Sequence, residues 1–279
     1  MPTVLITGAA RGIGKSITTR MADAGWDVVA GVRSDEDAAA ITAVDPRRIT
    51  SVLLDVTNPD HLGALPAALP ARVDAVVNNA GISVGGPLET VSVEDWRKQL
   101  DVNLIGPMAV TRAVLPKLRE TTGRVVFISS VSGRMSLPLV GPYCASKFAV
   151  EAAADALRLE VQAWGIDVVV VEPAQTDTDM ARSAGATLDE VEAALSPEHR
   201  ALYAEHVAAM KKLVVSMMKK PVPADKVAAV VAEALTARRP RARYVVGFVP
   251  RLQVALMTNL PMPLRDRLVL SLSGLPRRR

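Results

Sequence analysis

The chain has 279 residues, of which 49% are apolar, enough to bury a substantial core in one domain of the larger α/β kind. Its one cysteine, Cys144, excludes an internal disulfide and fits a reducing compartment, and we interpret it as a packing residue. The three histidines have no metal-ligand spacing with that cysteine, which argues against a metal site and zinc-dependent catalysis.

The first elements along the chain predict a pyrophosphate site. An apolar run with strand character, Thr3–Ile6, leads into the glycine-rich turn Thr7–Gly14 (TGAARGIG), and a helical pattern follows from Lys15 to Ala24. Glycines in such a turn let the backbone approach phosphates, and the helix start offers unpaired N–H groups. The spacing is G-x-x-x-G-x-G, so an ordinary turn stays the alternative for this motif taken alone.

The second predicted strand, Asp27–Ala30, bears on the choice of dinucleotide. Arg33 follows its end, and Arg11 stands in the glycine-rich turn. A carboxylate at this place accepts a hydrogen bond from a free ribose 2′-hydroxyl, whereas a guanidinium suits a 2′-phosphate. Two arginines and no acid at positions 31–33 favour NADP(H). NAD stays the alternative because Asp35 and Glu36 follow closely.

Short β-branched runs continue along the chain and alternate with helical patterns. This rhythm predicts a mainly parallel, doubly wound Rossmann-type sheet of seven strands, with helices on both faces and ligands at the carboxyl ends of the strands. The expected strands lie near residues 3–6, 27–30, 50–54, 75–77, 124–128, 168–172 and 243–246.

Tyr143 and Lys147, in the run GPYCASKF (141–148), stand four positions apart and therefore share one face of a helix. A helix rises about 1.5 Å per residue, which places the two roughly 6 Å apart along its axis. A fixed positive charge favours the phenolate of a tyrosine, whose ordinary pKa is about 10. Such a pair can exchange a proton near neutral pH without histidine. Alone, the spacing is common in helices and decides little.

Further motifs appear in a fixed order: Asp55-Val56, the run 78–81 (NNAG), Asn103, the pair Ser129-Ser130 and the run 173–178 (PAQTDT). Together with TGAARGIG and YCASK, they resemble the short-chain dehydrogenase/reductase family. The motifs cover about residues 3–178 and the expected architecture about 3–250. The runs SVSG (130–133) and YCASKFAV (143–150) are most similar to its hydroxysteroid and retinol dehydrogenase branch.

The resemblance implies roles for residues at matching positions. Tyr143 would donate or accept the proton, and Lys147 would lower its pKa and hold the nicotinamide ribose. Ser130 would orient the substrate oxygen, and Asn103 would help to position a proton-relay water. The family usually has glycine where this chain has Ala174, so a positive φ there would be strained. The implied cofactor contacts are Gly8, Arg11, Gly12, Ile13, Gly14, Arg33, Asp55, Val56, Asn79, Ala80, Gly81, Tyr143, Lys147, Pro173, Thr176 and Thr178.

The resemblance also implies a division of the chain. Residues 1–250 would form the dinucleotide-binding domain, with a substrate lid at 179–222 and a basic, apolar extension at 251–279. Helical patterns at 187–195 and 197–219 fit the lid. Its apolar side chains suit a lipophilic alcohol or ketone, or instead pack on the protein itself. They are Val207, Met210, Leu213, Val214, Met217 and Met218.

The C-terminus is strongly basic. Residues 238–279 hold ten arginines and one acid, a net charge of +9, and since the whole chain carries +4, residues 1–237 carry −5. Basic amphipathic segments bind anionic membrane surfaces, cover an active site or pack between subunits, so all three alternatives stay open. We expect no nucleic-acid binding, because only three Phe, three Tyr and three Trp are available for stacking.

We therefore expect an NADP(H)-preferring oxidoreductase that interconverts an alcohol and a carbonyl compound. We expect it in the cytoplasm, because a first strand at residue 3 leaves no room for a signal peptide and no apolar run spans a bilayer. The family resemblance implies a homodimer or homotetramer built from helices near 94–119 and 143–163. The alternatives are a non-catalytic dinucleotide sensor, an NAD-dependent alcohol dehydrogenase of the same family, and a serine hydrolase suggested by GISVG (81–85).

Overall fold

All seven predicted strands form one parallel sheet in the computed structural model, which describes residues 1–275. The sheet has the order β3-β2-β1-β4-β5-β6-β7, so the doubly wound architecture is confirmed. The last three arginines of the basic C-terminus lie outside the described residues. The strands are β1 (Thr3–Thr7), β2 (Asp27–Val32), β3 (Ile49–Leu53), β4 (Ala75–Asn78), β5 (Arg124–Ile128), β6 (Asp167–Glu172) and β7 (Arg243–Val245).

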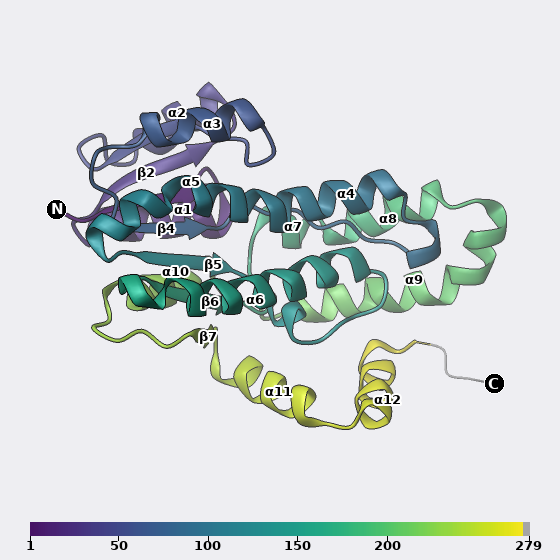
Figure 1. The fold of residues 1–279 in the computed structure, drawn as a ribbon. Coiled ribbons are helices and arrows are strands. Elements are labelled where there is room, and N and C mark those ends of the chain that lie inside the picture. The colour runs from purple at the N-terminus through teal and green to yellow at the C-terminus, as the bar shows by residue number, and fades with distance from the viewer. Residues whose placement is uncertain (276–279) are drawn as a thin grey trace.

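Helices cover both faces of the sheet, and Figure 1 shows α5 and α6 crossing one of them. Three short 3-10 helices and one π-helical turn, η2 (Asp101–Ile105), complete the described elements. The 3-10 helices are η1 (Leu88–Thr90), η3 (Val131–Gly133) and η4 (Gln162–Trp164). The α-helices are α1 (Gly12–Asp23), α2 (Asp35–Thr42), α3 (Pro59–Ala68), α4 (Val93–Leu100), α5 (Gly106–Thr121), α6 (Gly141–Val161), α7 (Asp179–Arg182), α8 (Ala184–Ala194), α9 (Pro197–Met217), α10 (Ala224–Thr236), α11 (Phe248–Asn259) and α12 (Met262–Ser273).

The core has two layers because side chains alternate along each strand. On β1, Val4 and Ile6 join one apolar cluster, and Leu5 between them joins the other. The first cluster includes side chains of α1 and α10, and the second includes side chains of α3, α5 and α6. Both faces of each central strand are therefore buried, as the nearly continuous apolar runs predict.

The strand order reverses between β1 and β4, and this reversal positions the site. The chain leaves β1 toward β2 on one side and returns to β4 on the other. In open parallel sheets the crevice beyond the carboxyl ends at such a point binds ligands. Here the glycine-rich turn follows β1 and Asn79 follows β4, so both predicted cofactor segments meet at this crevice.

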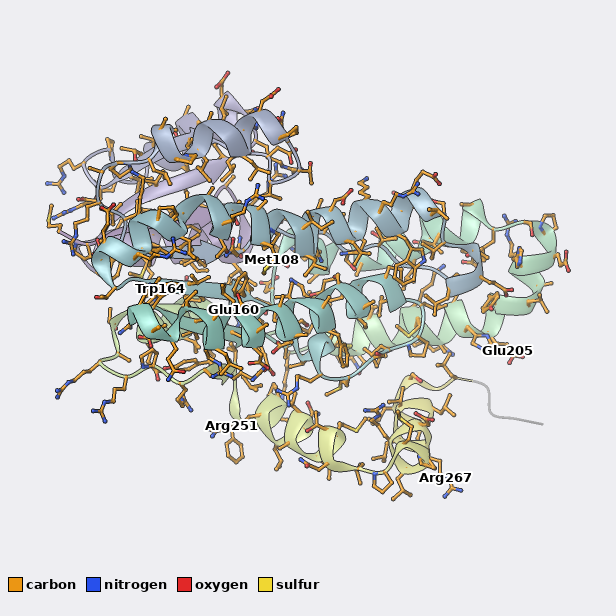
Figure 2. All side chains as sticks on the ribbon, viewed as in Figure 1. Met108, Glu160, Trp164, Glu205, Arg251 and Arg267 are labelled. Carbon is orange, nitrogen blue, oxygen red and sulfur yellow. The ribbon has the colours of Figure 1, made fainter. Side chains whose placement is uncertain are left out.

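Two helices extend beyond the sheet at the C-terminus. In Figure 1, α11 and α12 lie apart from the layered body, and α12 approaches α9. Val254 and Met257 of α11 are buried, whereas Phe248 and Leu252 are largely exposed. Figure 2 shows Arg251 and Arg267 projecting from these helices away from the body.

Candidate active site

Tyr143, Lys147 and Ser130 meet at the carboxyl end of β5. Tyr143 and Lys147 share one face of α6, and the Lys147 Nζ lies 5.7 Å from the centre of the Tyr143 ring. The Lys147 Nζ donates to the carbonyl of Ile128, the last residue of β5, at 2.9 Å. Ser130, two residues further on, lies near enough to the Tyr143 side chain to lower the pKa of its phenol. The structure thus brings together the three groups that the sequence predicts for proton transfer.

Burial acts against the charged forms of this pair. Lys147 is only 6% exposed, and desolvation lowers the pKa of its ammonium to about 8, while Glu151 on the same helix raises it. Tyr143 is partly exposed, but desolvation of its phenol raises its pKa, and the nearby Ser130 hydroxyl counters this. The two pKa values therefore move in opposite directions, upward for the phenol and downward for the ammonium.

Asn103 lies on the π-helical turn η2 and holds a loop beside the catalytic helix. Its amide Nδ2 donates to the Ile82 carbonyl at 3.0 Å and to the Ser146 hydroxyl at 3.1 Å, and its Oδ1 accepts from the Ile82 N–H at 2.9 Å. Ser146 in turn donates to the Tyr143 carbonyl at 2.7 Å. Turns of this kind interrupt α-helices frequently at functional sites. Asn103 thus connects the loop after β4 to α6.

Gln99 is a site residue that sequence reasoning missed. It is fully buried on α4, donates to the Ile82 carbonyl at 3.1 Å and accepts from the Val84 N–H at 2.6 Å. Its amide also donates to Ser146 at 3.3 Å. Gln99 and Asn103 are four positions apart and therefore share one face of a helix. This spacing of two amide side chains is the sequence signal that could have identified Gln99.

The glycine-rich turn approaches the neighbouring strand too closely for side chains. Gly8 has φ +63°, and a Cβ there would lie 3.0 Å from the Ala80 Cα. A Cβ on Gly14 would lie 2.1 Å from the Gly8 carbonyl oxygen. Ile13 follows as the second residue of α1, so the turn delivers the helix start at the crevice. This turn fits the pyrophosphate of a dinucleotide, because phosphate oxygens bind to unpaired backbone N–H groups that they can approach closely.

Asn79 and Thr7 fasten the two cofactor segments to each other. The Asn79 amide donates to the carbonyls of Thr7 and Gly8 at 3.0 and 3.1 Å, and the Thr7 hydroxyl accepts from the N–H groups of Asn79 and Ala80, each at 3.0 Å. Gly81 follows with space for a Cβ 3.5 Å from the Asn103 Oδ1. The segment 79–81 therefore forms a fixed wall of the crevice.

Charged side chains lie where the adenosine end of the dinucleotide is expected to bind. The Arg11 guanidinium lies 3.5 Å from the Asp37 carboxylate and is 64% exposed. Hydrogen bonds from Thr57 lower the pKa of the Asp55 carboxyl, and the positive charge of Arg33 adds to this effect. Val56, the next residue, is instead buried against Gly106. Arg11 and Arg33 thus flank the carboxyl ends of β1, β2 and β3.

The segment 173–178 closes the opposite side of the crevice. The Pro173 carbonyl accepts from the Val131 N–H at 3.0 Å, and Thr176 pairs with Val222 in a β-bridge. Thr178 caps α7, and its methyl would lie 3.2 Å from a Cβ on Gly12. Ala174 carries no such strain, because its φ is not positive and the chain turns here without needing glycine.

The lid helices α8 and α9 confirm the predicted helical patterns, but much of their apolar surface is used inside the protein. Val207 and Met210 are 1% and 3% exposed and pack with Leu139 and Leu188. These two side chains therefore stabilise the lid itself. Of the two alternatives left open by the sequence, packing on the protein itself is the one found for Val207 and Met210, because the loop at Leu139 covers them.

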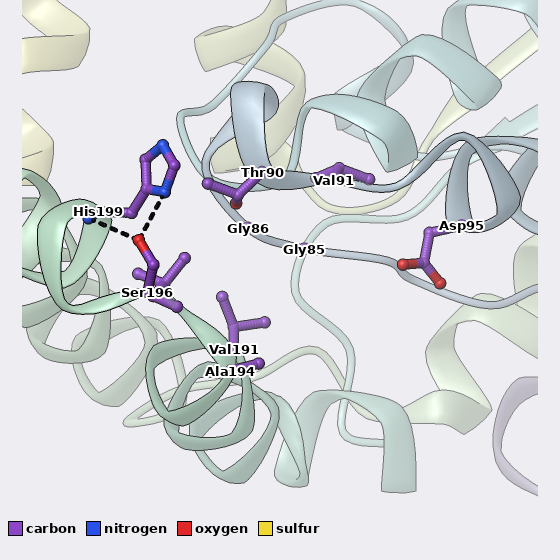
Figure 3. Close-up of a pocket in the computed structure, with 10 residues that line it drawn as sticks. Gly85, Gly86, Thr90, Val91, Asp95, Val191, Ala194, Ser196 and His199 are labelled. Atoms are coloured by element: carbon purple, nitrogen blue, oxygen red, sulfur yellow. Dashed lines mark hydrogen bonds between the residues drawn. The ribbon is translucent and has the colours of Figure 1, made fainter.

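A pocket of about 360 Å³ opens between the loop after β4 and the turn joining α8 to α9 (Figure 3). Ser196 and His199 line it, with their Oγ and Nδ1 2.9 Å apart, but Ser196 accepts from the His199 N–H as the cap of α9. Asp95, on another wall, accepts from Ser92 at 2.8 Å. These contacts are helix caps, and Tyr143 does not line the pocket.

The hydrolase alternative fails on backbone geometry. A nucleophile elbow needs a strand running directly into the serine and a helix running directly out. Ser83 instead lies exposed in a loop, five residues beyond the end of β4 and well before α4.

Comparison with known proteins agrees with this geometry. Residues 2–189 match the family described as short chain dehydrogenase. Retinol dehydrogenase 5 from Mus musculus is 32% identical over 275 residues, covering 94% of this chain and 86% of the relative. NADPH-dependent 3-dehydrocapnine reductase from Ornithobacterium rhinotracheale is 32% identical over 277 residues, covering 95% and 94%. The crystal structure of a short-chain dehydrogenase from Streptomyces avermitilis superimposes with TM-score 0.78 at 28% identity, covering 96% and 94%.

The match covers well over half of the chain, and the relatives span nearly all of it. The protein therefore belongs to the short-chain dehydrogenase family and is an oxidoreductase acting on an alcohol or carbonyl group.

Proposed function

We propose that this protein is an NADP(H)-preferring oxidoreductase that uses Tyr143 as its proton donor and acceptor. The observation that carries the proposal is the convergence of Tyr143, Lys147 and Ser130 at the end of β5. A non-catalytic sensor would need the dinucleotide crevice alone, without a buried ammonium beside a phenol. Burying such a charge is costly and favours a catalytic use.

The nicotinamide, when bound, supplies or accepts the hydride. The hydroxyls of Ser130 and Tyr143 bind the substrate oxygen, where negative charge develops as a carbonyl is reduced. Tyr143 then delivers its proton to that oxygen, or removes the proton when an alcohol is oxidised. The Lys147 ammonium stabilises the phenolate that results. Asn103 keeps the loop after β4 aligned with α6, and we propose that it also positions a relay water.

The cofactor preference rests on Arg11 and Arg33. Guanidinium groups bind phosphate with two parallel hydrogen bonds, so a 2′-phosphate gains more here than a 2′-hydroxyl. Asp37 pairs with Arg11 and competes for it, which leaves Arg33 as the stronger determinant. The relative named as an NADPH-dependent reductase supports the same preference, and NAD stays the alternative.

The substrate is proposed to be lipophilic. Met218 lies beside the cofactor segment, because its sulfur accepts from the Gln175 amide at 3.3 Å, one residue before Thr176. Leu213, Val214 and Met217 are half-buried on the same lid. Flexible thioethers and branched side chains at this place suit an irregular apolar molecule. We accordingly assign residues 179–222 to a substrate lid and residues 1–250 to the catalytic domain, and a relative named retinol dehydrogenase supports the substrate class.

The extension 251–279, with the start of α11, is proposed to contact the membrane surface from the cytoplasm. Exposed apolar side chains recur every four residues on each helix, at 248, 252 and 256 on α11 and at 264, 268 and 272 on α12. Arg251, Arg265 and Arg267 stand beside them. Within residues 1–275 no helix has the length and apolar character needed to cross a bilayer. An apolar stripe flanked by arginines fits the surface of an anionic membrane.

Copies of the chain are proposed to pair through α5 and α6, as a homodimer or homotetramer. Large apolar side chains are exposed on or next to these helices, at Ile105, Phe148, Leu159 and Trp164. Light scattering of the purified protein measures the assembly.

Tyr143→Phe is expected to bind NADPH with wild-type affinity and to lose turnover by roughly 10²- to 10⁴-fold, because the ring stays and only the proton is lost. Cofactor fluorescence measures binding, and reduced-nicotinamide absorbance measures turnover. Tyr203→Phe, a tyrosine of the lid, is the matched control. Wild-type turnover in Tyr143→Phe would support the sensor instead.

Arg33→Ala is expected to weaken NADPH binding by roughly ten- to a hundredfold and to leave NADH binding nearly unchanged, because one charge-assisted phosphate contact is lost. Fluorescence titration with both dinucleotides measures the two affinities. Arg47→Ala, an exposed arginine beyond α2, serves as the control. Equal losses for both dinucleotides would show that Arg33 does not read the 2′-phosphate.

A panel of steroid, retinoid and long-chain alcohols is expected to give higher kcat/KM than small polar alcohols, because each buried methylene adds about 0.8 kcal/mol of binding. The reverse panel of ketones and aldehydes with NADPH tests the other direction. Exclusive turnover of the small polar compounds would contradict a lipophilic substrate.

Leu252→Glu combined with Leu268→Glu is expected to abolish co-sedimentation with anionic phospholipid vesicles, because both charges enter the apolar stripe. Leu202→Glu, at an equally exposed leucine on α9, is the control and retains binding. Wild-type binding should fall with added salt and be weak on neutral vesicles. Unchanged sedimentation of the double variant would refute the membrane contact.

A further inference from the structure

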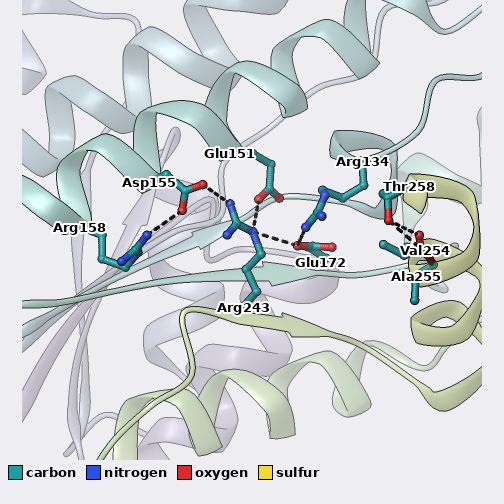
Figure 4. Close-up of polar contacts among 9 residues, drawn as sticks. All are labelled: Arg134, Glu151, Asp155, Arg158, Glu172, Arg243, Val254, Ala255 and Thr258. Atoms are coloured by element: carbon teal, nitrogen blue, oxygen red, sulfur yellow. Dashed lines mark hydrogen bonds and ion pairs between the residues drawn. The ribbon is translucent and has the colours of Figure 1, made fainter. Parts of the chain in front are cut away.

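A second cluster of charges lies buried behind the catalytic pair. Glu172, the last residue of β6, is fully buried, and Glu151 on α6 is 5% exposed. Arg243 on β7 contacts both carboxylates through its Nε, at 3.0 Å to Glu151 and 3.5 Å to Glu172, and its Nη2 reaches Asp155 at 2.5 Å. Figure 4 shows Arg243 between these acids.

Three members of the cluster, Glu151, Glu172 and Arg134, come from segments that also carry a site residue. Glu151 shares α6 with Tyr143 and Lys147. Glu172 directly precedes the cofactor segment 173–178. Arg134, which contacts Glu172 at 3.4 Å, follows the short helix η3 that begins after Ser130. The cluster therefore joins the three active-site segments from behind.

Glu151 stands one helical turn from Lys147, on the face that already holds Tyr143. Within residues 1–275, the Lys147 Nζ has one hydrogen bond, to the Ile128 carbonyl, which is neutral. Over the same residues the Glu151 Oε1 is buried without a hydrogen-bond partner. Gly133 packs against both residues and against Ser129, because a Cβ there would lie 3.1 Å from the Glu151 Cγ and from the Lys147 carbonyl oxygen, and 2.8 Å from the Ser129 Oγ.

We propose that Glu151 is the counter-charge that keeps Lys147 protonated, with Arg243 fixing its orientation, and that it is thereby a positioning residue for the Tyr143–Lys147 pair. The effect of Glu151 on the protonation of Lys147 needs neither substrate nor cofactor. Its effect on catalysis rests on the proposed function. A buried ammonium with only a neutral acceptor otherwise loses its proton.

The charges that face Glu151 agree with this role. Burial lowers the pKa of Lys147 to about 8, and Glu151 is the group that raises it. Burial, and then repulsion from Glu151, raises the pKa of Glu172 to about 7, against the attraction of Arg134 and Arg243. Glu172 therefore holds its proton up to about neutral pH, and of the two carboxylates Glu151 makes the shorter contact with Arg243.

The test is an NMR titration of the lysine side chains in the full chain without substrate or dinucleotide. Lys147→Met identifies the resonance. Glu151→Gln is expected to lower the titration midpoint of Lys147 by roughly one pH unit. Glu151→Met, a neutral side chain of similar length, is the second neutral variant.

Two further variants distinguish the loss of the Glu151 charge from a structural disturbance of α6. Glu151→Asp keeps the charge and is expected to keep the midpoint nearer the wild type than either neutral variant. Glu160→Gln changes an exposed acid of the same helix, labelled in Figure 2, and is expected to change nothing. An unmoved Lys147 midpoint in both neutral variants, or an equal shift in Glu160→Gln, would overturn the counter-charge.

Turnover gives the second readout. The neutral Glu151 variants are expected to lower kcat at neutral pH several-fold with little change in KM, and to displace the kcat–pH profile, whereas Glu151→Asp restores it. A shifted Lys147 midpoint with an unchanged profile would overturn the positioning role. Because the titration needs no substrate, failure of the proposed function would leave its result intact.

Discussion

The burial of one lysine ammonium against the end of a parallel strand is the constraint on which this site depends. Lys147 lies 6% exposed with its Nζ on the Ile128 carbonyl, so its charge persists only where neighbouring groups stabilise it. The Tyr143 ring lies 5.7 Å from this ammonium, and the low-dielectric surroundings that disfavour the charge also screen it less from the ring.

The doubly wound fold supplies the geometry for this pair. Parallel strands end along one edge, so β1, β4, β5 and β6 deliver the glycine-rich turn, Asn79, Ser130 and Pro173 to a single crevice. Buried amides then fix the loops between them. Gln99 and Asn103 hold the loop after β4, and Ser146 transmits that contact to α6. Helix, loop and strand ends are thus held in one arrangement before any ligand arrives.

The strands and the ordered motifs followed from local signals. Runs such as 168–172 are β-branched and buried on both faces, so their pattern survives any tertiary context. The spacing of Tyr143 and Lys147 is likewise a property of one helix. The lid was harder, because Val207 and Met210 are equally suited to a substrate or to Leu139. Sequence periodicity tells which face is apolar but does not tell what covers it.

The sequence by itself determined the strand segments, the glycine-rich turn and the helical face shared by a phenol and an amine, because each depends on residues close together in the chain. Only the tertiary structure decided that Arg243, from the last strand, lies between Glu151 and Glu172, and that Ala174 turns without strain. Those outcomes depend on residues some 90 positions apart, such as Arg243 and Glu151. Contacts over such separations follow from packing of the whole fold, which no local pattern encodes.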